Sequence, residues 1–214
     1  MIIAILGGTG KEGSGLAIRW AQAGHKILIG SRDAERARQR AAELSKQVSG
    51  AIEGLTNLEA ARHGELVVIT VPFAGQRALL EEVKAPLQGK IVVDTVVPMD
   101  LKAGRPYVPP AEGSAAEEAQ AVLGPGAKVV AAFHHIAAHE LSALDHAISG
   151  DGLFCGDDAA AKAVVAELIK ATGARPVDVG PLKHAPLIEG ITPLLIEINK
   201  RYKIKASGIR ITGI

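Results

Sequence analysis

The feature that most constrains this chain is a glycine-rich turn between its first apolar run and its first helical segment. Residues 6–15 have the sequence LGGTGKEGSG, with five glycines directly after the apolar residues 2–6. A chain uses glycine this densely where its backbone must turn sharply or approach another group closely. The spacing Gly8-x-Gly10-x-x-Gly13, between a predicted strand and a predicted helix, is typical of a turn that binds the pyrophosphate of a dinucleotide.

Each glycine of this pattern has a predicted role. Gly8 permits the tight turn, Gly10 lets a pyrophosphate reach the backbone, and Gly13 lets the following helix pack closely on the strand. The free N–H groups and partial positive charge at the start of the helix stabilise phosphates. The neighbouring residues that we expect to line the same site are Thr9, Lys11 and Glu12. The alternative is a tight turn without a ligand.

The end of the second predicted strand indicates which dinucleotide binds. An NAD site places Asp or Glu there, bonded to the ribose, whereas this chain has GSR at residues 30–32. Arg32 offers a planar fork suited to a phosphate, Ser31 adds a hydroxyl, and Arg36 stands one helical turn further along. We therefore expect NADP. Two alternatives stay open: the arginines form a solvated helix face, or Asp33 binds the ribose instead of capping the next helix.

Apolar runs alternate with helical segments along the chain, which predicts a doubly wound α/β fold (Rossmann) with a parallel sheet covered on both faces. We expect residues 1–150 to form the NADP-binding domain and residues 151–214 a small C-terminal part. Strands are predicted at 2–6, 26–29, 66–71, 91–94, 128–133, 152–155 and 175–179. Helices are predicted at 12–23, 33–48, 75–83, 114–123, 158–172 and within 181–202, and a loop at 97–112.

Composition excludes several classes of protein. The 24 Lys and Arg nearly balance the 23 Asp and Glu, and aromatic residues make up 3%, which argues against a nucleic-acid partner. Cys155 is the one cysteine, so no internal disulfide forms, as expected of a cytoplasmic protein. The apolar start lacks a basic region and predicts a strand rather than a signal peptide. No apolar run is long enough to predict a membrane span.

The predicted strand ends offer histidines but no Tyr-x-x-x-Lys or Ser-x-x-x-Lys pair for proton transfer. His135 and His139 have the i, i+4 spacing of metal ligands, but no acidic residue or cysteine stands in obvious register with them. His134 or His135 could instead act as a general acid, or simply form the wall of a pocket. The small and apolar residues around them suit a flat ring that lies on the nicotinamide.

The sequence resembles the NADPH-dependent oxidoreductases of the deazaflavin coenzyme F420, over nearly the whole chain. The resemblance is carried by LGGTG-x-x-G at 6–13, GSR at 30–32, VPF at 71–73, VVP at 96–98, H-x-I-x-A at 134–138, CGDD at 155–158, E-x-x-TPL at 189–194 and the final GI. It implies a homodimer that transfers hydride directly between C4 of the nicotinamide and C5 of the deazaflavin, with no catalytic side chain and no metal.

The resemblance also implies two sets of binding residues. The NADP set is Gly8, Thr9, Gly10, Lys11, Glu12, Gly13, Ser31, Arg32, Arg36, Val71, Pro72 and Ala138. The deazaflavin set is His134, Ile136, Ser207, Gly208 and Ile209. The wide apolar face within residues 181–202 predicts the dimer contact.

Three other functions remain open at this point. One is an NADPH-dependent imine or carbonyl reductase with His134 or His135 as the acid. Another is a reductase of a ferric chelate or a flavin. The third is an NADP(H)-binding sensor module without catalytic activity.

Overall fold

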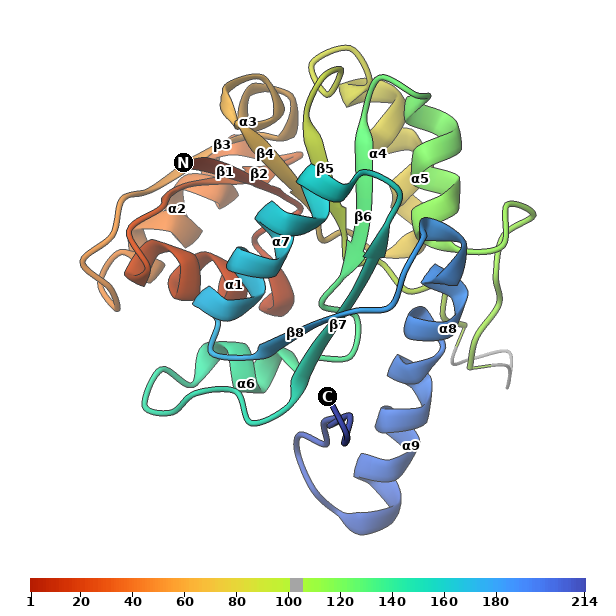
Figure 1. The fold of residues 1–214 in the computed structure, drawn as a ribbon. Coiled ribbons are helices and arrows are strands. Elements are labelled where there is room, and N and C mark those ends of the chain that lie inside the picture. The colour runs from red at the N-terminus through yellow and green to blue at the C-terminus, as the bar shows by residue number, and fades with distance from the viewer. Residues whose placement is uncertain (101–105) are drawn as a thin grey trace.

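A computed structural model describes residues 1–100 and 106–214 and shows one eight-stranded sheet with helices on both faces (Figure 1). The strand order is β3-β2-β1-β4-β5-β6-β7-β8. The strands are β1 (Ile2–Leu6), β2 (Lys26–Ser31), β3 (Ile52–Thr56), β4 (Leu66–Ile69), β5 (Ile91–Asp94), β6 (Lys128–Ala132), β7 (Asp151–Gly156) and β8 (Arg175–Asp178). The order of the first six strands is that of a Rossmann fold, with the chain reversing direction across the sheet beside β1.

The helices that cover the sheet follow the strands in alternation. The α-helices are α1 (Lys11–Gln22), α2 (Ala34–Leu44), α3 (Asn57–His63), α4 (Gln76–Val83), α5 (Ala115–Leu123), α6 (Ala138–Ser142), α7 (Ala159–Ala171), α8 (Ala185–Glu189) and α9 (Ile191–Tyr202). Short 3-10 turns, η1 (Phe73–Gly75) and η2 (Leu182–His184), precede α4 and α8. No helix among the described residues is long and apolar enough to cross a membrane.

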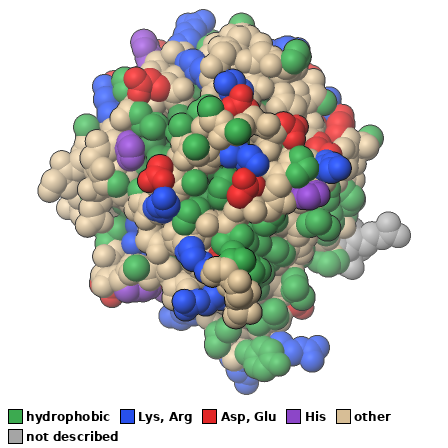
Figure 2. Space-filling model, in the orientation of Figure 1, with side chains coloured by type: hydrophobic (Ala, Val, Ile, Leu, Met, Phe, Trp, Pro, Cys, Tyr) green, Lys and Arg blue, Asp and Glu red, His purple; other side chains and the backbone are tan. Residues whose placement is uncertain are grey.

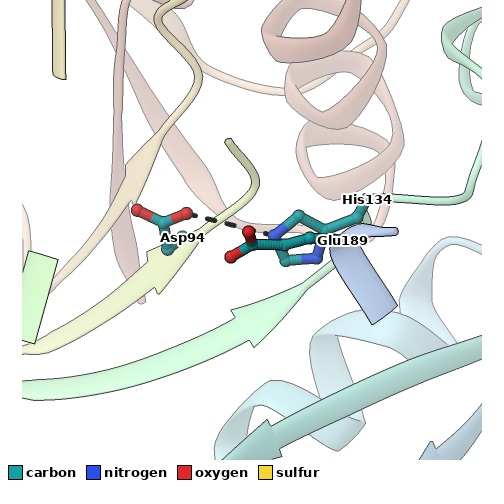
Figure 3. Close-up of side chains that lie close together, drawn as sticks. All are labelled: Asp94, His134 and Glu189. Carbon is teal, nitrogen blue, oxygen red and sulfur yellow. Dashed lines mark ion pairs between the residues drawn. The ribbon is translucent and has the colours of Figure 1, made fainter. Parts of the chain in front are cut away.

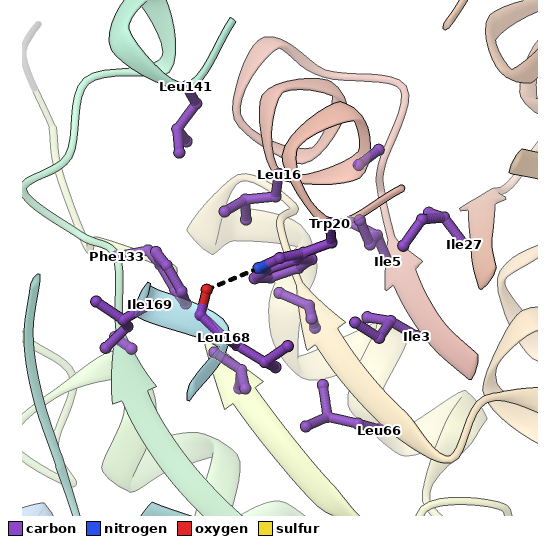
Figure 4. Packing of buried hydrophobic residues seen from close by; sticks show 14 of the residues in the cluster. Ile3, Ile5, Leu16, Trp20, Ile27, Leu66, Phe133, Leu141, Leu168 and Ile169 are labelled. Carbon is purple, nitrogen blue, oxygen red and sulfur yellow. Dashed lines mark hydrogen bonds between the residues drawn. The ribbon is translucent and has the colours of Figure 1, made fainter. Parts of the chain in front are cut away.

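Side chains alternate along β1 and so divide the core into two layers. Ile3 and Ile5 pack with α1, α2 and α7 on one face, whereas Ala4 and Leu6 pack with α3, α4, α5 and α8 on the other. Trp20 fills the centre of the first layer, where its indole N–H donates to the carbonyl of Leu168 over 2.9 Å (Figure 4). Aliphatic residues thus bury both faces of the sheet, as the composition predicts.

The sequence predictions hold for most elements and miss three. β3, α3 and α6 were assigned to no element, because each is short and carries polar residues. The structure stabilises α3 with a capping box, in which the Thr56 hydroxyl accepts from the Glu59 N–H and the Glu59 carboxylate accepts from the Thr56 N–H. Asp33 caps α2 as expected, accepting from the N–H groups of Glu35 and Arg36. Residues 101–105 of the predicted loop lie outside the described residues.

Two strands depart from the predicted all-parallel sheet. β1 to β6 are parallel, but β7 runs antiparallel to β6, and β8 then runs parallel to β7. The chain turns back at Phe133, whose φ of 70° is left-handed, and reaches β7 through α6. The α/β class is confirmed. β7 and β8 extend the sheet of the first 150 residues, and the division at residue 150 stays a prediction.

Candidate functional site

The carboxyl ends of β1, β2, β4, β5 and β6 meet at one edge of the sheet and enclose a cleft of about 1010 Å³. The cleft runs from the glycine turn, past the loops after β4 and β5, to His134 and Thr192. Of the residues predicted to bind NADP, those that line it are Thr9, Gly10, Lys11, Glu12, Ser31, Arg32, Arg36, Val71 and Pro72. The residues predicted from the sequence therefore form most of the cleft wall beside the glycine turn.

The glycine turn matches the predicted division of roles. A Cβ on Gly8 would lie 2.7 Å from the carbonyl oxygen of Ile5, and one on Gly13 would lie 2.6 Å from the Cα of Gly8. Neither position has room for a side chain. A Cβ on Gly10 would have no atom nearer than the Gly7 oxygen at 3.7 Å, so the backbone there is open to the cleft. Gly8 and Gly13 shape the turn without lining the cleft, whereas Gly10 leaves room for a ligand.

The end of β2 presents cations without partners. Arg32 and Arg36 are exposed, line the cleft and make no ion pair with the rest of the described chain. Asp33 lines the cleft too, but its carboxylate already accepts two N–H groups of α2, at 2.9 and 3.3 Å. The two arginines of this corner suit a phosphate, and Asp33 uses its Oδ1 atom to cap α2.

Glu12 is the one acidic side chain at the start of α1, where the site would receive phosphate. Its Oε1 atom is buried and has no hydrogen-bond partner within the described residues. Burial raises the pKa of Glu12 to about 8, so the side chain is largely neutral at pH 7. A neutral carboxyl group can lie beside a phosphate without repelling it.

Asn57 lines the cleft and was not found from the sequence. Its Oδ1 atom accepts the Gly7 N–H at 3.2 Å and so ties α3 to the glycine turn. Asn57 is the first residue of a helix that the sequence analysis did not recognise. An asparagine after a Thr cap carries no motif that points to this contact.

A buried cluster of two carboxyl groups and an imidazole lies at the inner end of the cleft (Figure 3). Asp94 ends β5, His134 follows β6 and Glu189 ends α8, and ligand atoms of the three lie within 4.8 Å of one another. Nε2 of His134 is 4.0 Å from Oδ1 of Asp94, and both side chains are fully buried. The hydroxyl of Thr192 donates to the His134 carbonyl at 2.7 Å and joins α9 to this cluster.

The partners of the cluster indicate where its protons lie. Glu189 accepts the N–H groups of Ala115 and Ala116 and the hydroxyl of Tyr107, each at 3.1 Å. Asp94 accepts the Val96 N–H at 3.0 Å, but its Oδ2 and both ring nitrogens of His134 have no hydrogen-bond partner in residues 1–100 and 106–214. The better-satisfied Glu189 is the easier of the two acids to ionise.

Burial sets the charge of each group. Burial, and then the charge of Glu189, raise the pKa of Asp94 well above its usual value. Burial raises the pKa of Glu189 to about 7, opposed by its two backbone N–H donors. Burial and then His135 lower the pKa of His134 to about 3, with the Val96 backbone working in the opposite direction. Burial therefore favours the neutral form of Asp94 and the uncharged form of His134. The sequence had suggested no acid in register with the histidines.

The other predicted deazaflavin residues lie together in a small neighbouring hollow of about 40 Å³. Ile136 forms one side, and the tail residues Ser207, Gly208 and Ile209 form another. His134 lies in the cleft instead, two residues away from Ile136. Ala138 lines neither space; its carbonyl lies against Gly15 of α1. The tail thus reaches a segment seventy residues earlier in the chain, a pairing that the resemblance implied.

His135 and His139 do not form the metal-binding pair that their i, i+4 spacing suggests. His135 is buried, with Nε2 in contact with the Asp151 carbonyl at 2.8 Å, whereas His139 is exposed. Cys155 is buried, and burial raises the pKa of its thiol to about 12, which leaves it unreactive. In the described chain, the possible metal ligands that do converge are Asp94, His134 and Glu189.

Comparison with known proteins identifies the family. The sequence model described as NADP oxidoreductase, coenzyme F420-dependent, matches residues 2–98. The chain is 41% identical to the F420-dependent NADP reductase of Methanothermobacter marburgensis over 222 residues, covering 100% of this chain and 99% of that protein. It is 43% identical to that of Methanocaldococcus jannaschii over 224 residues, again covering 100% and 99%.

A solved structure gives the same relationship for the fold. A crystal structure from Arthrobacter sp. FB24, described as an F420-dependent NADP reductase, superposes with a TM-score of 0.86 at 29% identity and covers 99% of both chains. Similarity therefore extends from the glycine turn through the C-terminal helices to the tail. The chain belongs to the family of F420-dependent NADP reductases.

Proposed function

We propose that this protein transfers hydride reversibly between NADP(H) and the deazaflavin coenzyme F420 in the cleft at the carboxyl edge of the sheet. The observation that carries the proposal is full-length similarity to F420-dependent NADP reductases, at 41 and 43% identity, in a chain whose cleft extends from the glycine turn to His134. NADP(H) and F420 supply the hydride donor and acceptor when bound. The protein binds and orients them.

The outer end of the cleft binds the dinucleotide. Gly10 leaves backbone space for the pyrophosphate, and the start of α1 directs N–H groups toward it. Arg32 and Arg36, which lack partners in the described chain, bind the 2′-phosphate, with the buried Ser31 beside them. Val71 and Pro72 form the next part of the wall and direct the nicotinamide inward.

The inner end binds the deazaflavin. His134 forms the end of the cleft, and Ile136 with residues 207–209 forms the adjoining hollow. The cleft walls here are mostly small or apolar side chains, which exclude water and hold two flat rings in contact. No side chain takes part in the hydride step.

The assembly is a homodimer that acts in the cytoplasm. Apolar side chains gather around α8 and α9 (Figure 2), where Leu187 is 70% exposed, Leu194 57% and Tyr202 69%. An apolar surface of this kind on so small a protein favours a second copy of the chain as its partner. The single cysteine is a buried free thiol, which agrees with a reducing compartment.

The test follows the hydride. NADPH deuterated separately at each C4 position is mixed with F420 and the protein in ordinary water, and C5 of the product is analysed by mass spectrometry. One labelled form should deliver its deuterium and the other none, because the nicotinamide has one face against the protein. Parallel reactions with a flavin, a ferric chelate and an imine test the other reductases. Loss of label to solvent, or oxidation of NADPH by these acceptors but not by F420, would refute the proposal.

A further inference from the structure

We infer that Gly15 and Arg19 of α1 are positioning residues for the acceptor site, which they support by holding α6 against the helix that binds the dinucleotide. Gly15 is the one glycine of the opening turn sequence after Gly13, and the dinucleotide pattern gives it no role. Gly15 and Arg19 are four residues apart, so they lie on one face of α1. The inference rests on the proposed function for the identity of the acceptor.

Gly15 allows the two helices to approach closely. A Cβ on Gly15 would lie 2.6 Å from the Cβ of Leu141 and 3.5 Å from the carbonyl oxygen of Ala138. Real Cβ atoms essentially never come as near as the first of these distances. α6 therefore packs on α1 through the space that a side chain at position 15 would fill.

Arg19 holds the end of α6 one helical turn later. Its Nε donates to the carbonyl of Leu141 at 3.0 Å, and Nη2 donates to that of Glu140 at 2.9 Å. Nη2 also bonds the carbonyl of Ala143, and both Nη atoms donate to that of His146 at 3.1 Å. The fork thus binds carbonyl groups of the last turn of α6 and of the residues that follow it.

The guanidinium is suited to this structural role. Arg19 is 8% exposed, and its burial lowers its pKa, opposed by the charges of Glu140 and Asp145. Those two acids contact His146, with Glu140 Oε2 at 3.2 Å from Nε2 and Asp145 Oδ1 at 2.9 Å from Nδ1. The acids and the carbonyl groups together compensate a charge that is largely removed from water.

The segment that Arg19 holds is also a wall of the hollow. Six residues from within or beside this segment line the hollow. They are Ile136, Ala137, Glu140, Ile148, Ser149 and Gly150. Glu140 both accepts from Arg19 through its carbonyl and faces the hollow. A five-residue helix such as α6 is too short to be stable alone, so its position depends on these contacts.

The experiment compares Arg19→Met, Arg19→Lys and Gly15→Ala with Arg40→Met in the full-length protein. Arg40 is a matched control, because it is a half-buried arginine on α2 that bonds Ser14 and Glu43 and does not contact α6. F420 binding is measured by its fluorescence and kcat/KM for F420 from initial rates with NADPH. NADPH binding is measured by calorimetry, and hydrogen exchange over residues 138–149 by mass spectrometry without ligands.

Arg19→Met and Gly15→Ala should speed exchange over 138–149 and lower kcat/KM for F420, by up to about 100-fold for a displacement near 1 Å. The Kd for NADPH should stay within about twofold, as in Arg40→Met. Arg19→Lys keeps the charge and three donors, so it should fall between the wild type and Arg19→Met. It also gives a folded variant should Arg19→Met fail to fold.

The outcome separates this inference from the proposed function. Unchanged exchange over 138–149 in Arg19→Lys and Gly15→Ala would overturn it, as would an equal loss of NADPH and F420 affinity. Faster exchange with unchanged F420 affinity would also overturn it, because α6 would then not position the acceptor. A wild-type protein that does not bind F420 would refute the proposed function, while the exchange result would still test the support of α6 by α1.

Discussion

Asp151 and Arg175, the first residues of the neighbouring strands β7 and β8, form a two-point ion pair that holds the C-terminal tail. Nε and Nη2 of Arg175 lie 2.8 Å from Oδ1 and Oδ2 of Asp151. Nη1 of Arg175 also donates to the Ile214 carbonyl at 2.9 Å, and the Asp151 N–H donates to the Ile209 carbonyl at 2.8 Å. The tail forms one wall of the hollow, and its position therefore depends on the Asp151–Arg175 ion pair, which does not line the cleft proposed for the dinucleotide.

Arg175→Met should free the tail and weaken F420 binding, by about tenfold if one hydrogen-bonded charge contact is lost. NADPH affinity should not change. Lys162→Met is the control, because it removes a neighbouring ion pair, to Asp178 at 2.8 Å, without a tail contact. Fluorescence titration with F420 and calorimetry with NADPH measure the two affinities. Equal F420 affinities in the two variants would show that the tail does not form this site.

Gly10→Val and Gly13→Ala should fail in different ways. Gly10 has space for a side chain, so Gly10→Val should keep the thermal midpoint nearly unchanged and abolish NADPH binding. A Cβ on Gly13 would clash with the backbone of Gly8, so Gly13→Ala should destabilise the fold, by about 1–3 kcal/mol. Thermal denaturation and NADPH titration of both variants are the measurements. Full NADPH affinity in Gly10→Val would place the pyrophosphate elsewhere.

Arg32→Glu should remove the preference for NADP. Replacing a phosphate-binding cation with an anion should raise the KM for NADPH by about 30-fold, or 2 kcal/mol, and affect NADH little. Arg38→Glu is the control, because Arg38 is an exposed arginine of the following helix, α2, that bonds Glu35 and does not line the cleft. A wild type that uses NADH and NADPH equally would contradict the assignment of Arg32.

Asp94→Asn should remove a buried carboxylic acid. Because burial holds the pKa of Asp94 well above 3.8, the infrared difference spectrum between wild type and variant at pH 7 should show the loss of one protonated carboxyl band, while the band of the neutral Glu12 stays in both. A pKa raised on folding stabilises the protein at low pH, and this stabilisation is lost as pH rises above the unfolded value, at about 1.4 kcal/mol per pH unit. The free energy of unfolding should therefore decline less with pH in Asp94→Asn, measured from about pH 5 to 8 in urea.

Leu194→Lys should dissociate the proposed dimer. A charge at this exposed apolar position of α9 would be buried in the proposed interface, where an unpaired charge costs several kcal/mol. Glu197→Lys on the same helix alters a residue that pairs with Lys200 within its own chain and serves as the control. Light scattering gives the mass of each species. A wild type that is active as a monomer would remove the prediction.

The cleft wall formed by the glycine turn and the end of β2 could be predicted from the sequence because its determinants are local. Gly8, Gly10 and Gly13 lie within six residues of one another, and their roles follow from backbone geometry that any chain with this spacing shares. Arg32 and Asp33 follow the next strand, and the capping of α2 by Asp33 was expected. The turn, the helix start and the strand end are each fixed by short-range rules.

The inner end of the cleft could not be predicted in this way, because its determinants are distant in sequence. Glu189 meets Asp94 and His134 only after the chain has crossed the sheet and returned through α8. Arg19 bonds carbonyl groups more than a hundred residues away, and a lone arginine on a helix carries no sequence signal of a partner. The roles of Glu189 and Arg19 become visible only from their burial and their contacts in the structure, and not from the residue types.

The reversal of β7 places the starts of two strands beside the finishing ends of the others. The cleft proposed for the dinucleotide lies where strands finish, whereas Asp151 and Arg175 stand where β7 and β8 start, because these strands run the opposite way to β6. α6 and the turn after α7 precede these strand starts. Because β7 runs against β6, the strand starts lie at the same edge of the sheet as the carboxyl ends of β1 to β6, and one reversed strand thereby brings the C-terminal tail to the side of the cleft.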